Sequence, residues 1–224
     1  KILNIGCGNA FDYHLWFRFK PKKIVGVDVM NYTKSWNTVL EYKKKNKIIT
    51  EIEFYKNDFV NFKYKEKFDF IVSDAVFEHC KDFDSVVAKC FEYLKDDGIM
   101  YASYGGPMWF TYGGDHFSGR DDALNGFNHL LLKREDYDKY VDENIGTFEH
   151  ELNEGGGGGF LVKNELFSKL TANQYFEIFQ KYKFKSKYTC VEYCPIGLKL
   201  LKTNFSLKEK LKKKFPLIFF LKHI

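Results

Sequence analysis

The sequence lacks the marks of several classes of protein. None of its five cysteines forms a C-x-x-C pair, so their spacing predicts neither a zinc site nor a disulfide framework, and a reducing cytoplasm is the expected compartment. The longest uninterrupted apolar run, residues 217–221, is far shorter than the ~20 residues of a membrane-spanning helix. The net charge of +5 is too small to indicate a nucleic-acid partner by itself.

The excess positive charge lies mainly in two lysine-rich stretches, residues 43–47 and 208–214. Solvated helix surface is the simpler interpretation of both stretches. Attraction to phosphate-bearing substrates or to anionic lipid is the alternative. We therefore expect no nucleic-acid partner and no stable membrane insertion, and a weak membrane-surface contact through the basic C-terminal helix stays open.

Short apolar runs alternate with helical patterns over the first two thirds of the chain, which is typical of βαβ units and a parallel sheet. We expect strands at residues 1–5, 23–28, 51–56, 68–73 and 98–103, and helices at 11–19, from Tyr32 to Leu40, and at 83–94, the last ended by residues 95–98. The length of 224 residues fits one domain, 1–224. Because Lys1 already lies inside a strand pattern, we expect a further N-terminal segment before it.

The pattern changes after the fifth expected strand. Residues 105–165 are rich in Gly, Asp, Asn and aromatic residues with little periodicity, so we expect an insertion or lid there. The glycine run at 155–159 is typical of a flexible loop or a join. Further on, residues 188–192 and 196–202 suggest a closing antiparallel pair, and Ser206-x-x-Glu209 suggests a capping box at the start of the last helix.

A glycine-containing turn follows the first strand. Gly6 and Gly8 allow a tight turn and a close approach of the backbone to a ligand, and Asp28 ends the second strand about twenty residues later, where an acid accepts hydrogen bonds from ribose hydroxyls. A dinucleotide-binding turn needs a third glycine at position 11, which is Phe11 here. NAD and FAD are therefore disfavoured, and a cofactor without phosphates fits better.

Five segments together resemble the motifs of class I S-adenosylmethionine-dependent methyltransferases. The resemblance covers residues 1–104 in the family's order: Asn4-Ile-Gly-Cys-Gly-Asn-Ala10, Val25-Gly-Val-Asp28, Asn57-Asp-Phe59, Phe68 to Cys80, and Leu94-Lys-Asp-Asp-Gly98. Ala10 stands where the family has a third glycine, and Asp96 where it has proline. The resemblance implies a doubly wound, Rossmann-like α/β fold with a mostly parallel seven-stranded sheet and the lid after strand five.

The resemblance also implies a cofactor, S-adenosylmethionine, with S-adenosylhomocysteine as its product. Gly6, Cys7 and Gly8 would lie under its methionine part, and Asp28, followed by Val29, would hold its ribose. Asp58 would accept from the adenine amino group with Phe59 beside the ring. Ser73, Asp74 and Ala75 would border the sulfonium and the methyl acceptor.

The catalytic base is predicted among the histidines. Methyl transfer to a hydroxyl needs a proton acceptor near the sulfonium, and His79 and His116 follow strands four and five at the correct end of the sheet. Asp115 precedes His116 and would orient its imidazole. A structural role for His79 is an equal alternative. Glu78-His79 also resembles the end of a metal-binding E-x-x-E-H of quinone O-methyltransferases, but Ala75 replaces its first carboxylate, so no metal is expected.

The acceptor is the least defined part of the prediction. The segment from Tyr104 to His116 resembles methyltransferases encoded with bacterial capsule and lipopolysaccharide genes, and Trp109 and Tyr112 suit stacking on rings. We expect O-methylation of a nucleotide-activated or phosphate-bearing precursor of a surface polysaccharide. A quinone or other small-molecule O-methyltransferase is an alternative, as is a cofactor-binding module without catalysis.

Overall fold

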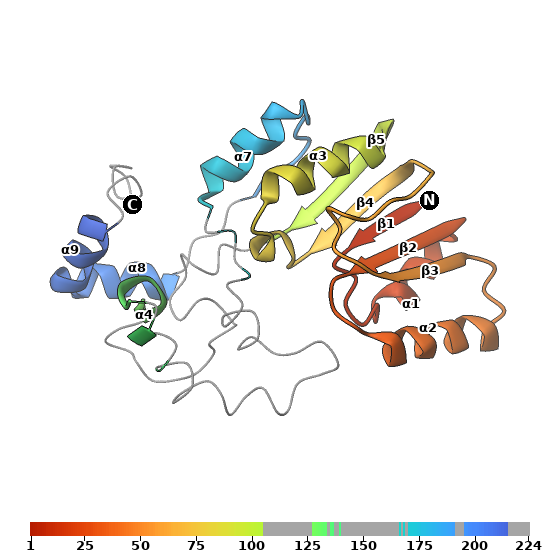
Figure 1. Cartoon of the computed structure of the whole chain (residues 1–224), viewed down its shortest axis with the longest axis horizontal. Helices are drawn as coiled ribbons and strands as arrows, with labels where there is room; N and C mark the ends of the chain where they lie inside the picture. Colours follow the sequence, from red (N-terminus) through yellow and green to blue (C-terminus); the bar gives the residue numbers. More distant parts are fainter. Residues whose placement is uncertain are drawn as a thin grey trace.

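The structure is a computed structural model that describes residues 1–104, 127–133, 135–136, 139, 166, 168, 170–190 and 195–214 (Figure 1). Its helices and strands follow the chain as β1 Ile2–Ile5, α1 Tyr13–Trp16, the 3-10 helix η1 Phe17–Phe19, β2 Lys23–Asp28, α2 Thr33–Lys45, β3 Glu51–Lys56, β4 Phe68–Asp74, the 3-10 helix η2 Phe77–His79, α3 Phe83–Tyr93, β5 Leu94–Ser103, α4 Asn128–Leu131, α7 Ala172–Lys181, α8 Pro195–Thr203 and α9 Phe205–Lys214.

The sheet confirms the strand prediction. Its five described strands have the order β3-β2-β1-β4-β5 and every neighbouring pair is parallel. The chain order reverses between β2 and β4, which both pair with β1, so the switch point lies at the carboxyl end of β1. Seven strands are not confirmed, and nearly all of the expected lid at 105–165 lies outside the described residues.

Helices pack on both faces of the sheet (Figure 1). On one face, α3 and α7 bury a core that includes Leu3, Ile71, Phe83 and Tyr175. On the other face, α1 and α2 cover β1 to β3 through Tyr13, Phe17 and Trp36. This two-sided arrangement is what the buried, β-branched strands predict, since a parallel sheet needs cover on both faces.

The cover is incomplete over β4 and β5 on the α1 side. Phe70, Ile99 and Tyr101 are exposed there, although they alternate along their strands with buried or half-buried residues of the opposite face. The described helices therefore shield only the β1–β3 half of this face.

Helix α3 follows the predicted pattern. Asp82 caps it by accepting from the Ser85 backbone N–H at 3.1 Å, and Val86, Val87 and Cys90 form its buried stripe. The expected turn at residues 95–98 is wrong in form, because β5 begins directly at Leu94. The ladder instead pairs Leu94 with Phe68 and Ile99 with Phe70, so the residues between them form an irregularity within the strand.

Three local predictions are wrong. Residues 196–202 lie in α8, not in a strand, because Pro195 suits the first helical position and Leu and Lys favour a helix. Helix α9 starts at Phe205, where Asn204 rather than Ser206 acts as the cap and accepts from the Leu207 N–H at 3.0 Å. The first helix is shorter than the expected 11–19, since α1 starts at Tyr13 and passes into η1.

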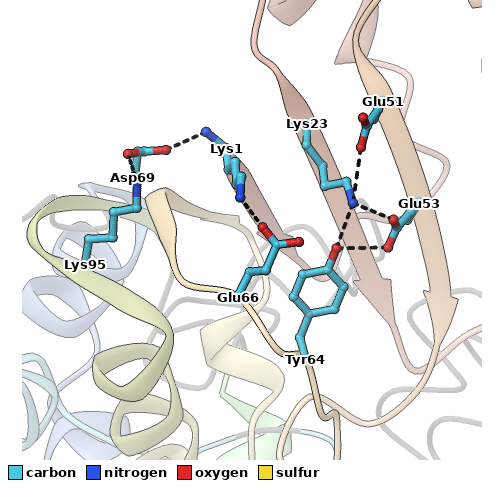
Figure 2. Close-up of polar contacts among 8 residues, drawn as sticks. All are labelled: Lys1, Lys23, Glu51, Glu53, Tyr64, Glu66, Asp69 and Lys95. Atoms are coloured by element: carbon cyan, nitrogen blue, oxygen red, sulfur yellow. Dashed lines mark hydrogen bonds and ion pairs between the residues drawn. The ribbon is translucent and has the colours of Figure 1, made fainter.

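Polar contacts join the amino ends of the strands, opposite the candidate site (Figure 2). Lys23 of β2 donates to Glu53 of β3 at 2.7 Å and to Tyr64 at 3.2 Å, and these contacts raise the pKa of Lys23. Lys95 donates to Asp69 at 2.6 Å beside the irregularity in β5. These pairs fix the strand register at this end and leave the carboxyl ends for other contacts.

Candidate cofactor site

The turn after β1 lies at the carboxyl end of the sheet, against the end of β2. The backbone N–H groups of Gly6 and Cys7 both donate to the Val27 carbonyl, at 2.8 and 3.2 Å. The Asn57 N–H, directly after β3, donates to the Asp28 carbonyl at 2.8 Å. Three consecutive loops of the sheet therefore meet around the end of β2, at the place where open α/β sheets bind ligands.

Asp28 links these loops through its side chain. Its two carboxylate oxygens accept from the Gly8 N–H and the Met30 N–H, each at 2.8 Å. The residue is only 9% exposed, and burial raises the pKa of its carboxyl although both hydrogen bonds act in the opposite direction. Each carboxylate oxygen keeps further acceptor capacity, which suits a ligand that offers two hydroxyl groups.

The two glycines of the turn have different roles. Both have positive φ, +66° at Gly6 and +49° at Gly8. A Cβ on Gly6 would lie 2.2 Å from a Val76 methyl, so Gly6 permits close packing between the loops after β1 and β4. A Cβ on Gly8 would have nothing within 4 Å, so the backbone of Gly8 presents an open face. Only Gly8 therefore has the geometry of a residue that a ligand approaches closely.

The side chains of Cys7 and Trp36 both contact the Gly8 carbonyl. Cys7 is buried, and burial raises the pKa of its thiol well above the ordinary range, with the charge of Asp28 acting in the same direction. The Trp36 indole N–H donates to the Gly8 carbonyl at 2.7 Å. Trp36 is not among the predicted site residues, because its only signal in the sequence is a helical spacing of apolar residues.

The segments after β2 and β3 supply less buried groups. Val29 is 61% exposed, and Asp58 is also exposed, with one oxygen accepting from the Val60 N–H at 3.1 Å. Phe59 is buried and packs against Phe62 and Tyr93, and its expected place beside a ring of the cofactor stays a prediction. The exposed Val29 side chain is also available for an apolar contact at this edge.

The end of β4 contains a buried hydroxyl. The Ser73 hydroxyl is fully buried and has no hydrogen-bond partner among the residues that the structure describes, whereas Asp74 and Ala75 are exposed. Ala75 has a φ of +52°, and its N–H donates to the Ser103 carbonyl at 2.8 Å. Unpaired buried hydroxyls are uncommon in proteins, so Ser73 is an unusual feature at the end of β4, next to the exposed Asp74 and Ala75.

The Glu78-His79 pair lies in η2 beneath these groups. Glu78 is buried, and the His79 Nδ1 lies 2.8 Å from the Leu166 carbonyl, which can only accept, so this nitrogen carries the proton. This contact supports the structural interpretation of His79. Tyr104, at the end of β5, is half-buried, and burial together with Glu78 raises its pKa to about 12.

Of the predicted site residues, the structure brings together Gly6, Cys7, Gly8 and Asp28. His116 and Asp115 lie outside the described residues. Within the part of the chain that is described, no group of three or more His, Cys, Asp or Glu side chains is placed to hold a metal ion. The residues present fit a ligand with vicinal hydroxyls and an apolar ring, which are the features of a nucleoside.

Comparisons with known proteins identify the family of this chain. The family model for a methyltransferase domain matches residues 1–145. The chain is 28% identical over 111 residues to malonyl-[acyl-carrier protein] O-methyltransferase of Acetivibrio thermocellus, with 49% of this chain and 37% of that protein covered. It is 30% identical over 101 residues to ubiquinone biosynthesis O-methyltransferase of Pelagibacter ubique, with coverage of 45% and 40%. The chain thus spans less than half the length of either relative.

A solved structure shows the same fold. Phosphoethanolamine N-methyltransferase 2 of Haemonchus contortus, in complex with S-adenosyl-L-methionine, superposes with a TM-score of 0.52 at 16% identity, covering 99% of this chain and 40% of that one. The fold is therefore the Rossmann-like methyltransferase fold. Since the family model also matches more than half of the residues, the chain belongs to the class I S-adenosylmethionine-dependent methyltransferases.

Proposed function

We propose that this chain binds S-adenosylmethionine at the turn after β1 and transfers its methyl group to a small acceptor. The cofactor supplies a methyl group on a positively charged sulfur. Asp28 accepts from the ribose hydroxyls, Val29 contacts the adenine ring, and the open face of Gly8 receives the part of the cofactor next to the ribose. The observation that carries the proposal is the contact of 2.8 Å between the Gly8 N–H and the Asp28 carboxylate, beside the open face of Gly8.

Calorimetric titration with S-adenosylhomocysteine tests the cofactor assignment. Asp28→Ala should weaken binding by at least about tenfold, because each hydrogen bond to a charged group contributes about 1.5–3 kcal/mol. Asp82→Ala is a matched control, since Asp82 is an acid that caps α3 away from the turn. Unchanged affinity in Asp28→Ala would refute the assignment of the cofactor to this site. Binding without turnover on any acceptor would favour a module without catalysis.

The proposed acceptor atom is oxygen. Two relatives in different organisms are O-methyltransferases by name, which supports this choice, and the chain has candidate proton acceptors in His79 and His116. The proposed substrate is a nucleotide-activated or phosphate-bearing precursor of a bacterial surface polysaccharide, and only the sequence of residues 104–116 supports it. A panel of sugar nucleotides assayed with radiolabelled S-adenosylmethionine tests it directly.

His116 is the proposed base, oriented by Asp115. His116→Ala should lower turnover by about 100-fold with cofactor affinity unchanged, as expected for loss of general base catalysis. The limb of the pH–rate profile near the imidazole pKa should disappear in this variant. A rate that survives the substitution would indicate an acceptor that is already anionic, such as a phosphate, and would leave the methyltransferase assignment intact.

A quinone or similar small aromatic acceptor is the second candidate. It is favoured by the 30% identity to the ubiquinone biosynthesis enzyme over 101 residues. The two candidates differ in their expected response to a chelator, because the quinone-type pattern includes a metal-binding carboxylate at the position of Ala75. We expect activity to survive EDTA, whereas loss that magnesium restores would favour the quinone-type acceptor.

The proposed partners are small molecules, with the cytoplasm as the proposed compartment. In the described residues, no helix is both long and apolar enough to cross a membrane. Helix α9 nevertheless carries exposed lysines at 208, 210 and 212–214, and Phe205 at its start is exposed. A weak contact with an anionic membrane surface through α9 is therefore part of the proposal. Co-sedimentation with vesicles that contain or lack phosphatidylglycerol tests this contact.

A further inference from the structure

Trp36, in the first turn of helix α2, contacts the candidate cofactor turn. Its indole N–H donates to the Gly8 carbonyl at 2.7 Å, and its ring stacks on Phe54 of β3 with centroids 5.1 Å apart and an interplanar angle of 2°. The residue is only 6% exposed. The stacked ring is therefore fixed by the sheet, so that the indole N–H has a defined direction toward the turn.

Gly8 is consequently held at both of its peptide groups. Its N–H donates to Asp28 at 2.8 Å, and its carbonyl accepts from Trp36 at 2.7 Å. A glycine without these contacts would sample both signs of φ, and the neighbouring Ala10 also has a positive φ of 56°. The two contacts select one conformation of the turn, the one in which the open face of Gly8 is directed away from Trp36 and the core.

We propose that Trp36 is a positioning residue that holds the Gly8 turn in its binding-competent conformation. This inference rests on the proposed binding of S-adenosylmethionine at the turn. A cofactor that binds one conformation loses apparent affinity in proportion to the fraction of molecules that leave that conformation. Removing the indole N–H leaves the Gly8 carbonyl with the long contact of 3.9 Å from the Cys7 thiol and lowers the competent fraction, without changing any group that contacts the cofactor.

A packing role alone would give a different result. Trp36 is a large buried side chain, so any substitution that reduces its volume lowers the free energy of unfolding. That loss would be shared by other tryptophans that stack in the same cluster. Affinity for the cofactor, measured below the melting temperature, responds only if the turn itself changes.

The experiment compares Trp36→Phe with Trp16→Phe. The Trp16 ring stacks on Tyr13 with centroids 4.9 Å apart in the same cluster, but its indole N–H has no hydrogen-bond partner in the described part of the chain. Both changes remove one indole ring and leave a phenyl ring. Calorimetry with S-adenosylhomocysteine should show affinity about two- to tenfold weaker in Trp36→Phe, the range expected for one hydrogen bond. Trp16→Phe should stay within about twofold of the wild type.

A second readout follows the indole protons directly. In the wild type without ligand, exchange of the Trp36 indole proton with solvent should be slow and that of Trp16 fast, because only the first is hydrogen-bonded inside the protein. Equal affinity of wild type and Trp36→Phe would overturn the inference, as would equal losses in the two variants. A wild type that binds no S-adenosylhomocysteine would instead refute the proposed function on which the inference depends.

Discussion

The substitution of alanine for each glycine of the turn separates folding from binding. At Gly6, the added Cβ would lie 2.2 and 2.7 Å from the two methyl groups of Val76, a β-branched side chain that cannot turn away. Overpacking costs about 1–3 kcal/mol and the left-handed backbone about 1–2 kcal/mol more, so Gly6→Ala should lose about 2–5 kcal/mol. At Gly8, the added Cβ meets no atom within 4 Å and only the backbone cost applies.

Thermal unfolding and calorimetry together measure the two effects. For a domain of this size each kcal/mol lowers the melting temperature by about 2–4 °C, so Gly6→Ala should lower it by roughly 4–20 °C and Gly8→Ala by roughly 2–8 °C. Affinity for S-adenosylhomocysteine should fall about tenfold or more in Gly8→Ala, because its methyl group occupies the face that the cofactor approaches. Full affinity in Gly8→Ala would refute the assignment of that open face to the cofactor.

Three further predictions concern single contacts. Lowering the pH should weaken the binding of S-adenosylhomocysteine, because the charged form of Asp28 binds hydroxyl groups better than the neutral form. Burial raises the pKa of Asp28, so the midpoint of this loss should lie above the ordinary value of 3.8, and calorimetry at a series of pH values checks it. Asp84→Asn should lower the free energy of unfolding in urea by up to about 1 kcal/mol at neutral pH, because it removes the exposed contact with Lys181. This contact lowers the pKa of Asp84 below 3.8, so its contribution to stability should disappear as the pH falls through the lowered pKa. His79→Ala should cost about 1–3 kcal/mol of unfolding free energy in the same assay, because the Leu166 carbonyl loses its donor, and an unchanged stability would argue against a structural His79.

The strands were predictable because burial on both faces leaves a direct mark in the sequence. Ile24, Val25 and Val27 are all buried in β2, and such a run of neighbouring β-branched residues is typical of a strand that is covered on both faces. The error in α8 has a physical reason too. Leu198 and Leu200 alternate with lysine as they would in a strand, but Pro195 at the first helical position was the stronger signal.

The site was predictable only where backbone geometry constrains the residue type. Gly8 and Asp28 are recognisable because a positive φ favours glycine and an acid can accept from the N–H groups around it. The contacts of Trp36 and Phe59 were not predictable, because the spacing of an aromatic residue indicates a core position whether or not the residue also contacts the site. Phe59 packs in the core and its contact with the cofactor stays a prediction, whereas Trp36 is a core residue with one additional polar contact to the turn.

Gly6 permits close packing of two loops that the proposed methyl-transfer site includes. Strand β1 pairs with β2 on one side and β4 on the other, so the loops after β1 and β4 leave from neighbouring strands. The missing side chain of Gly6 allows Val76, from the loop after β4, to approach the turn after β1. Strand pairing places Ser73 opposite Ile5, directly before Gly6. A side chain at position 6 would clash with Val76, so glycine here permits the packing of the two loops on which the proposed methyl-transfer site depends.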